Sequence, residues 1–128
     1  MDPFETRKTK KPSKRHQPRG LTILFEDDDI LVVDKMSGLL SMSNAKTRDR
    51  TAYFALNNYV RKGNPKSRKR IYIVHRLDRD TSGVLVFAKS EKNKRYLQDE
   101  WKNFSKKYYA VIHGNLAEKE GVLSSYLA

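Results

Sequence analysis

One short stretch of the sequence gathers most of the side chains that can do chemistry. Residues 75–83 hold an imidazole, two guanidinium groups, two carboxylates and two hydroxyls between two apolar runs. Catalytic groups are often carried by loops that a rigid sheet positions. A guanidinium near a carboxylate favours the ionised form, so Arg76 and Arg79 would keep Asp78 charged at neutral pH. The alternative is a charged loop whose acids and bases only pair with one another.

The order of residues in this loop resembles a family signature. The run from His75 to Gly83 reads His-Arg-Leu-Asp-Arg-Asp-Thr-Ser-Gly. It is similar to the His-Arg-Leu-Asp-x-x-Thr-Ser-Gly signature of the RluA-type pseudouridine synthases. Seven fixed positions would recur by chance in roughly one window in a billion, so a false match is improbable. The apolar run 84–89 also resembles the strand that follows this signature in the family.

Two further stretches match the family in the expected order. Residues 30–39 resemble its first motif, a strand that ends in a Lys-Pro-x-Gly turn, with Met36 in place of the usual proline. This replacement predicts a less rigid turn. Residues 106–114 resemble a later motif with a tyrosine in the uridine pocket, which Tyr108 matches, whereas Tyr109 is expected to be structural. The resemblance covers about residues 21–128 and does not reach the family's C-terminal motifs.

The resemblance implies an isomerase that converts uridine in RNA to pseudouridine with no metal and no cofactor. Asp78 would be the catalytic carboxylate, either as nucleophile at C1′ or as a base. Arg76 would help to hold the flipped-out nucleotide, and Tyr108 would stack on its uracil. The rest of the signature is expected to shape or anchor the loop: His75, Leu77, Thr81, Ser82 and Gly83.

Composition sets wider limits on partners and location. The 128 residues carry a formal charge of +12, which favours a polyanionic partner such as RNA, DNA or an anionic membrane surface. There are no cysteines, and the three histidines lack metal-ligand spacing. No apolar run is long enough to span a membrane, and the N-terminus lacks the apolar core of a signal peptide. These features favour a cytoplasmic protein without a metal.

Periodicity predicts the elements that position the loop. The expected fold class is α+β, with a mixed, mainly antiparallel sheet and helices packed on it. Asp27, Asp28 and Asp29 are read as a hairpin turn in preference to a metal site. Thr51 or Asp49 is expected to cap the first helix, and Ser90 the second. The expected strands are 21–26, 30–33, 71–74, 84–88, 107–113 and 122–127; the helices are 51–61 and 91–103, and 61–70 is a basic loop.

The chain divides into two parts. Residues 1–20 form a basic arm, read either as an RNA-binding tail or as a solvated terminus. Residues 21–128 would be the N-terminal portion of a catalytic domain, because strand-like sequence runs to the last residue. Three functions compete: a synthase acting on structured RNA (ribosomal or transfer RNA), a non-catalytic RNA-binding module, and a DNA-binding protein. The sequence has no helix-turn-helix or zinc-finger pattern, which argues against the third.

Overall fold

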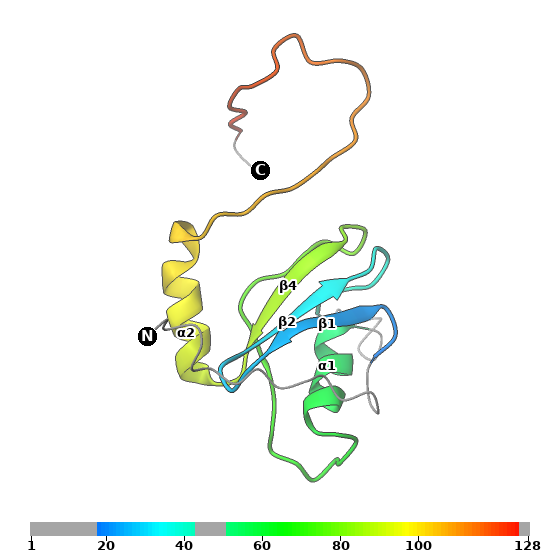
Figure 1. The fold of residues 1–128 in the computed structure, drawn as a ribbon, viewed down its shortest axis with the longest axis vertical. Coiled ribbons are helices and arrows are strands. Elements are labelled where there is room, and N and C mark those ends of the chain that lie inside the picture. Colours follow the sequence, from blue (N-terminus) through cyan, green and yellow to red (C-terminus); the bar gives the residue numbers. More distant parts are fainter. Residues whose placement is uncertain (1–17, 43–50, 126–128) are drawn as a thin grey trace, which may run out of the picture.

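The computed structural model of the chain describes residues 18–42 and 51–125. The predicted basic arm therefore lies almost wholly outside the described residues. Four strands form one antiparallel sheet in the order β1-β2-β4-β3 (Figure 1), so the predicted α+β class is confirmed. The elements are β1 (Leu21–Glu26), β2 (Ile30–Lys35), α1 (Ala52–Val60), β3 (Tyr72–Ile73), β4 (Gly83–Ala88), α2 (Glu91–Glu100) and the 3₁₀ turn η1 (Trp101–Asn103).

The β1–β2 hairpin forms where the three aspartates predicted a turn. Asp27 Oδ1 accepts hydrogen bonds from the backbone N–H groups of Asp29 (2.7 Å) and Ile30 (2.8 Å). A side-chain oxygen that satisfies two backbone donors in this way stabilises a tight turn. Within the described part of the chain no group of three or more acidic, histidine or cysteine side chains could hold a metal ion.

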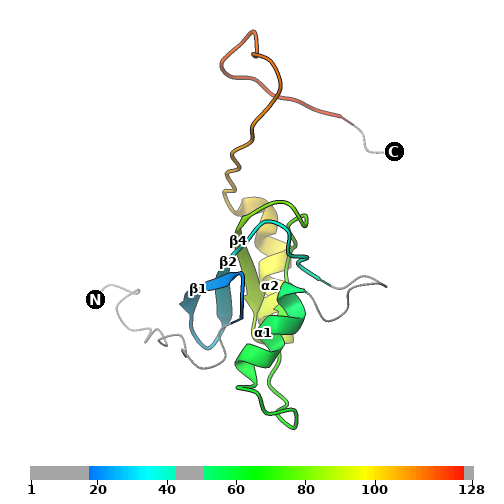
Figure 2. The same ribbon diagram turned by 90° about the vertical axis from the view of Figure 1, so that its right-hand side faces the viewer.

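The main core lies between α1 and one face of the sheet (Figure 2). Thr51 caps α1 as predicted, since its side chain accepts a hydrogen bond from the N–H of Phe54 (3.1 Å). The helix buries Ala52, Leu56 and Tyr59 against alternate side chains of the strands. The strand residues of this core are Leu21, Ile23, Leu31, Val33, Leu85 and Phe87.

The second helix begins at its predicted cap, with Ser90 accepting a hydrogen bond from the N–H of Asn93 (3.1 Å). Side chains that alternate with the core residues, such as Val84 and Val86, point away from α1. They line a cavity of about 910 Å³ together with Leu97 of α2 and Trp101. The end of α2 therefore faces the side of the sheet opposite the main core.

The predicted strands 107–113 and 122–127 are wrong for the residues that can be described. The segment 104–125 contains no strand and leaves the sheet as an extended chain (Figures 1 and 2). A strand needs a neighbour for its hydrogen bonds, and no residue of 107–113 or 122–125 pairs with β1 or β3, the strands at the two edges of the sheet. Alternating side chains alone cannot supply that partner. Residues 126–128 lie outside the described residues.

Two predicted elements are shorter in the structure than the sequence suggested. The predicted strand 71–74 is reduced to Tyr72–Ile73, which pair with Ala88 and Phe87. The predicted helix 91–103 is an α-helix to Glu100 and a 3₁₀ turn thereafter. Neither described helix has the length and apolarity needed to cross a membrane.

Candidate active site

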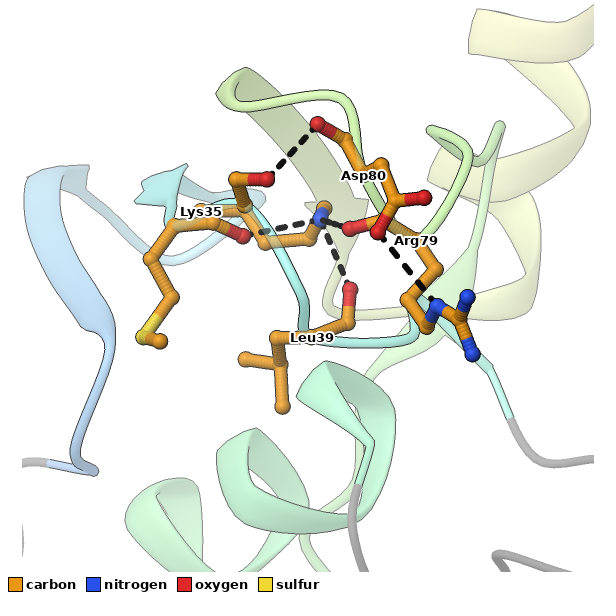
Figure 3. A network of polar contacts seen from close by, with 6 residues as sticks. Lys35, Leu39, Arg79 and Asp80 are labelled. Atoms are coloured by element: carbon orange, nitrogen blue, oxygen red, sulfur yellow. Dashed lines mark hydrogen bonds and ion pairs between the residues drawn. The ribbon is translucent and has the colours of Figure 1, made fainter.

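A buried lysine joins the loop after β2 to the loop 75–83. Lys35 ends β2 at a core-facing position and has no exposed surface. Its Nζ donates hydrogen bonds to three backbone carbonyls, those of Met36 (3.0 Å), Leu39 (2.7 Å) and Arg79 (3.0 Å; Figure 3). An isolated buried ammonium is strongly unfavourable, and charge-assisted bonds to three acceptors offset that penalty. Lys35 therefore holds the two loops together from within.

Two further contacts strengthen the same junction. The N–H of Gly38 donates to the carbonyl of Arg79 (2.8 Å), and Ser37 Oγ donates to the carbonyl of Asp80 (2.8 Å). Gly38 has φ of +94°, a left-handed conformation that favours glycine. Burial lowers the pKa of Lys35, and the charge of Asp80 opposes that shift. Despite Met36 at the expected proline position, the turn is held by side-chain and backbone bonds to its neighbour.

The residue before Asp78 is fixed by a buried serine. Ser41 Oγ donates to the carbonyl of Leu77 (2.6 Å) and accepts from the N–H of Leu77 (3.0 Å). After Asp78, the N–H of Thr81 donates to the Asp78 carbonyl (3.1 Å) and closes a turn. The Asp78 side chain is exposed, and no described group forms an ion pair or hydrogen bond with its carboxylate. The backbone around Asp78 is thus held while its carboxylate is open to solvent.

Acid–base pairing within the loop leaves out Asp78. Arg79 Nε lies 3.4 Å from Asp80 Oδ1, and both side chains are mostly exposed. Such a pair contributes at most about 1 kcal/mol. Arg76 is exposed, with Nη1 3.7 Å from the sulfur of Met42. Neither flanking guanidinium therefore forms the ion pair with Asp78 that the sequence allowed for.

The start of the loop is anchored by His75. Its Nε2 accepts a hydrogen bond from the N–H of Val86 in β4 (3.0 Å). Its ring lies on that of Trp101, with centroids 4.3 Å apart at 33°. Burial lowers the pKa of His75, and the charge of Lys106 acts in the same direction. A nitrogen that accepts a hydrogen bond carries no proton, so this bond and the lowered pKa both favour the neutral imidazole, and the bond ties the start of the loop to β4.

The 910 Å³ cavity gathers most of the predicted site, but not all of it. Its walls include Tyr108, which is 64% exposed, together with one side of the 75–83 loop. Gly83 has φ of +133°, a conformation that residues with a side chain rarely adopt, so a substitution at this position would be strained. Asp78 and Arg76 are not among the residues lining this cavity, whereas Asp80 is. The loop residues that do line it are His75, Leu77, Asp80, Thr81, Ser82 and Gly83.

Sequence reasoning did not select Lys35, Ser41 or Trp101 as site residues. A signal for Lys35 was present, because the period of two along β2 places it in phase with buried Leu31 and Val33. Ser41 and Trp101 carry no such local signal. Their roles depend on Leu77 and His75, which lie far from them along the chain.

Comparisons with known proteins agree with the geometry. A family model described as RNA pseudouridylate synthase matches residues 29–128. The chain is 36% identical over 110 residues to the uncharacterized RNA pseudouridine synthase MG209 of Mycoplasma genitalium. This alignment covers 84% of this chain and 34% of that protein. It is 35% identical over 112 residues to the ribosomal large subunit pseudouridine synthase D of Borreliella burgdorferi, with the same two coverages.

A solved structure shows a shared fold. The human RNA Pseudouridylate Synthase Domain Containing 4 superposes with a TM-score of 0.53 at 22% identity, over 64% of this chain and 30% of that one. The chain spans about a third of the length of the curated relatives it matches. The family model over residues 29–128 and these relatives together show that the chain belongs to the RNA pseudouridylate synthase family.

Proposed function

We propose that this chain carries the catalytic loop of an enzyme that isomerises uridines in RNA to pseudouridine, with Asp78 as the reacting carboxylate. One observation carries the proposal. The backbone on both sides of Asp78 is held by hydrogen bonds, while its carboxylate is exposed and has no partner among the described side chains. A preorganised, accessible carboxylate suits attack at a sugar carbon or removal of a sugar proton.

The proposed reaction is balanced without an outside reagent. The N1–C1′ bond of uridine breaks, the base turns, and C5 bonds to C1′; C5 then loses its proton and N1 gains one. Arg76 is proposed to occupy the space vacated by the extruded nucleotide, since a planar guanidinium stacks on bases. Tyr108 is proposed to stack on the uracil from the cavity wall that it shares with Thr81 and Ser82.

The proposed substrate is structured RNA, with ribosomal RNA first and transfer RNA second. The chain's formal charge of +12 favours binding to phosphates. A matched relative is named for the large ribosomal subunit, which supports ribosomal RNA as the first choice. The competing function is a non-catalytic RNA-binding module. The exposure of Tyr108 favours this alternative, because the ring proposed to stack on the uracil is 64% exposed and lies on a segment outside the sheet.

Tritium release from RNA that carries 5-tritiated uridine tests the proposal, because the C5 hydrogen must leave when C5 bonds to C1′. We expect Asp78→Ala to lower release at least about 10³-fold while RNA affinity changes little. Asp80→Ala is the matched control, as it removes an exposed carboxylate from the same loop. It should retain release within about tenfold. Equal losses in both variants would assign the effect to the loop as a whole. RNA binding without release by any form would favour the binding module.

A further inference from the structure

A second cavity lies beside the end of β4 that is farther from the loop 75–83. It has a volume of about 590 Å³ and shares no lining residue with the 910 Å³ cavity. Gly83 begins β4 beside the signature loop, and Lys89 follows β4 and lines the second cavity. Six residue steps along a strand separate these two positions by roughly 20 Å. We call it the basic cavity, after its five cationic lining residues: Lys62, Arg68, Lys69, Arg70 and Lys89.

Two of the least exposed charged residues of the basic cavity, Glu26 and Lys89, pair with each other. Glu26 Oε2 lies 2.5 Å from Lys89 Nζ, and Glu26 Oε1 accepts a hydrogen bond from the Tyr59 hydroxyl (2.9 Å). The Lys89 and Glu26 side chains are only 16% and 10% exposed. Their charges therefore offset each other in a shielded place, and Lys89 is not available as a free cation. Any attraction for a ligand must come from the side chains of the rim.

One arginine of the rim is held against an aromatic ring. Arg70 Cζ lies 4.5 Å from the centre of the Tyr72 ring, and Arg70 Nη2 donates to the Tyr53 hydroxyl (3.1 Å). These contacts fix the plane of the guanidinium without neutralising its charge. An oriented guanidinium of this kind is suited to a phosphate group, which it can bind through two parallel N–H donors.

The other three rim cations lie on an ordered loop. Lys62, Arg68 and Lys69 are exposed, and none forms an ion pair within the described ranges. Arg61 Nε donates to the carbonyl of Lys69 (2.8 Å), which returns the end of the loop to α1. Between them, Asn64 and Ser67 side chains accept backbone hydrogen bonds. An ordered loop backbone reduces the conformational entropy that binding must overcome.

These features together point to a polyanionic chain as the ligand. Four rim cations line the cavity together with Asp28, and Tyr72 offers part of an aromatic surface. Rows of cations with interleaved aromatic rings are typical of sites that follow a nucleic-acid backbone. We propose that the basic cavity binds sugar-phosphate groups of the RNA substrate away from the modified nucleotide. The inference rests on the proposed function, because it assigns a second contact to the same RNA.

A charge-matched pair of variants tests the assignment by RNA binding alone. One triple variant carries Lys62→Gln, Arg68→Gln and Lys69→Gln. The control carries Arg95→Gln, Lys102→Gln and Lys119→Gln, which are exposed and line neither cavity. For a structured RNA we expect the first variant to weaken binding roughly tenfold or more and to reduce the salt slope by about 2. The control should change affinity less than about threefold. Equal losses in both variants, or an unchanged slope in the first, would overturn the proposal.

RNA length and cross-linking separate this proposal from the proposed reaction. A uridine oligonucleotide too short to span roughly 20 Å should bind both triple variants alike. The chain has no cysteine, so Lys66→Cys places a single photo-cross-linker on the loop, and Lys92→Cys is the control. Preferential cross-linking of long RNA at position 66, with no tritium release, would support the basic cavity and count against the reaction. Release with no preference at position 66 would overturn the basic cavity alone.

Discussion

The loop 75–83 and residues 106–114 of the segment 104–125 resemble motifs of the same family, but the structure supports their positions to different degrees. The loop is fixed by Lys35, Ser41 and His75 through hydrogen bonds to the backbone of neighbouring elements. The segment beyond Phe104 has no backbone hydrogen bond to the sheet among the described residues. Its apolar side chains are largely exposed, and Val111 is completely so.

This difference shows which residues of the candidate site are positioned by contacts within the described structure. The position of Asp78 follows from buried polar groups that belong to β2, the loop after it and β4. The position of Tyr108 has no comparable determinant, although it lies in the same cavity wall as Ser82. Substitutions in the two regions should therefore differ sharply in their effect on stability.

Lys35→Met should have the largest effect. The substitution removes a fully buried ammonium from three backbone carbonyls, and we expect the free energy of unfolding to fall by about 2–4 kcal/mol. Urea denaturation monitored by Trp101 fluorescence measures the loss. Lys106→Met is the matched control, because its Nζ donates to one exposed carbonyl, that of Trp101 (2.8 Å). A control loss as large as that of Lys35→Met would contradict the difference between the regions.

Ser41→Ala should have an intermediate effect. The buried N–H and C=O of Leu77 both lose a partner, so we expect a loss of about 1–3 kcal/mol in the same measurement. Ser105→Ala, in the exposed segment, should change stability by less than about 0.5 kcal/mol. If Ser41→Ala were as mild as Ser105→Ala, the serine would not be what holds the residue before Asp78.

The free energy of unfolding should depend on pH through the protonation of His75. Its pKa is lowered in the folded protein, so the unfolded chain binds the proton more tightly. The contribution of the neutral His75 side chain to the free energy of unfolding is fully present above the unfolded pKa of about 6.5 and is lost as pH falls below it. Because protonation removes the Nε2 acceptor from Val86, the loss should reach about 1 kcal/mol.

Urea midpoints measured between pH 5 and 8 test this expectation. His75→Asn should flatten the profile in that range. His113→Asn, on the exposed segment, is the control. A profile that responds to His113 and not to His75 would reverse the assignment.

The fold and the signature loop were predictable from the sequence to different degrees. Alternating apolar residues and the caps Thr51 and Ser90 identified the first four strands and both helices, because those signals are local. The signature placed the loop correctly between two strands. The strand expected at 107–113 was wrong because a strand forms only where it pairs with another strand, which no local pattern records, and this segment pairs with neither edge strand of the sheet. The Ser41–Leu77 contact was missed for the same reason, since it joins residues 36 positions apart.

Tyr108→Ala should have the smallest effect on stability and still alter the reaction. With 64% of the residue exposed, we expect less than about 0.5 kcal/mol of destabilisation. If its ring stacks on the extruded uracil, its loss removes about 1–3 kcal/mol of base contact, so tritium release should fall about 10–100-fold. Tyr109→Ala, at a neighbouring position that is 91% exposed, is the control for both measurements and should leave release nearly intact.

The stability and tritium-release measurements together decide how the loop 75–83 and the segment 104–125 cooperate. Reduced release with unchanged stability would mean that Tyr108 acts on the RNA and is positioned by the RNA itself. The ordering entropy of the segment would then be part of the binding free energy and would weaken substrate affinity. Equal loss of release in the Tyr108 and Tyr109 variants would instead indicate that the segment contributes as a whole surface. The loop 75–83 would in either case remain the part of the site that the described contacts hold in place before RNA binds.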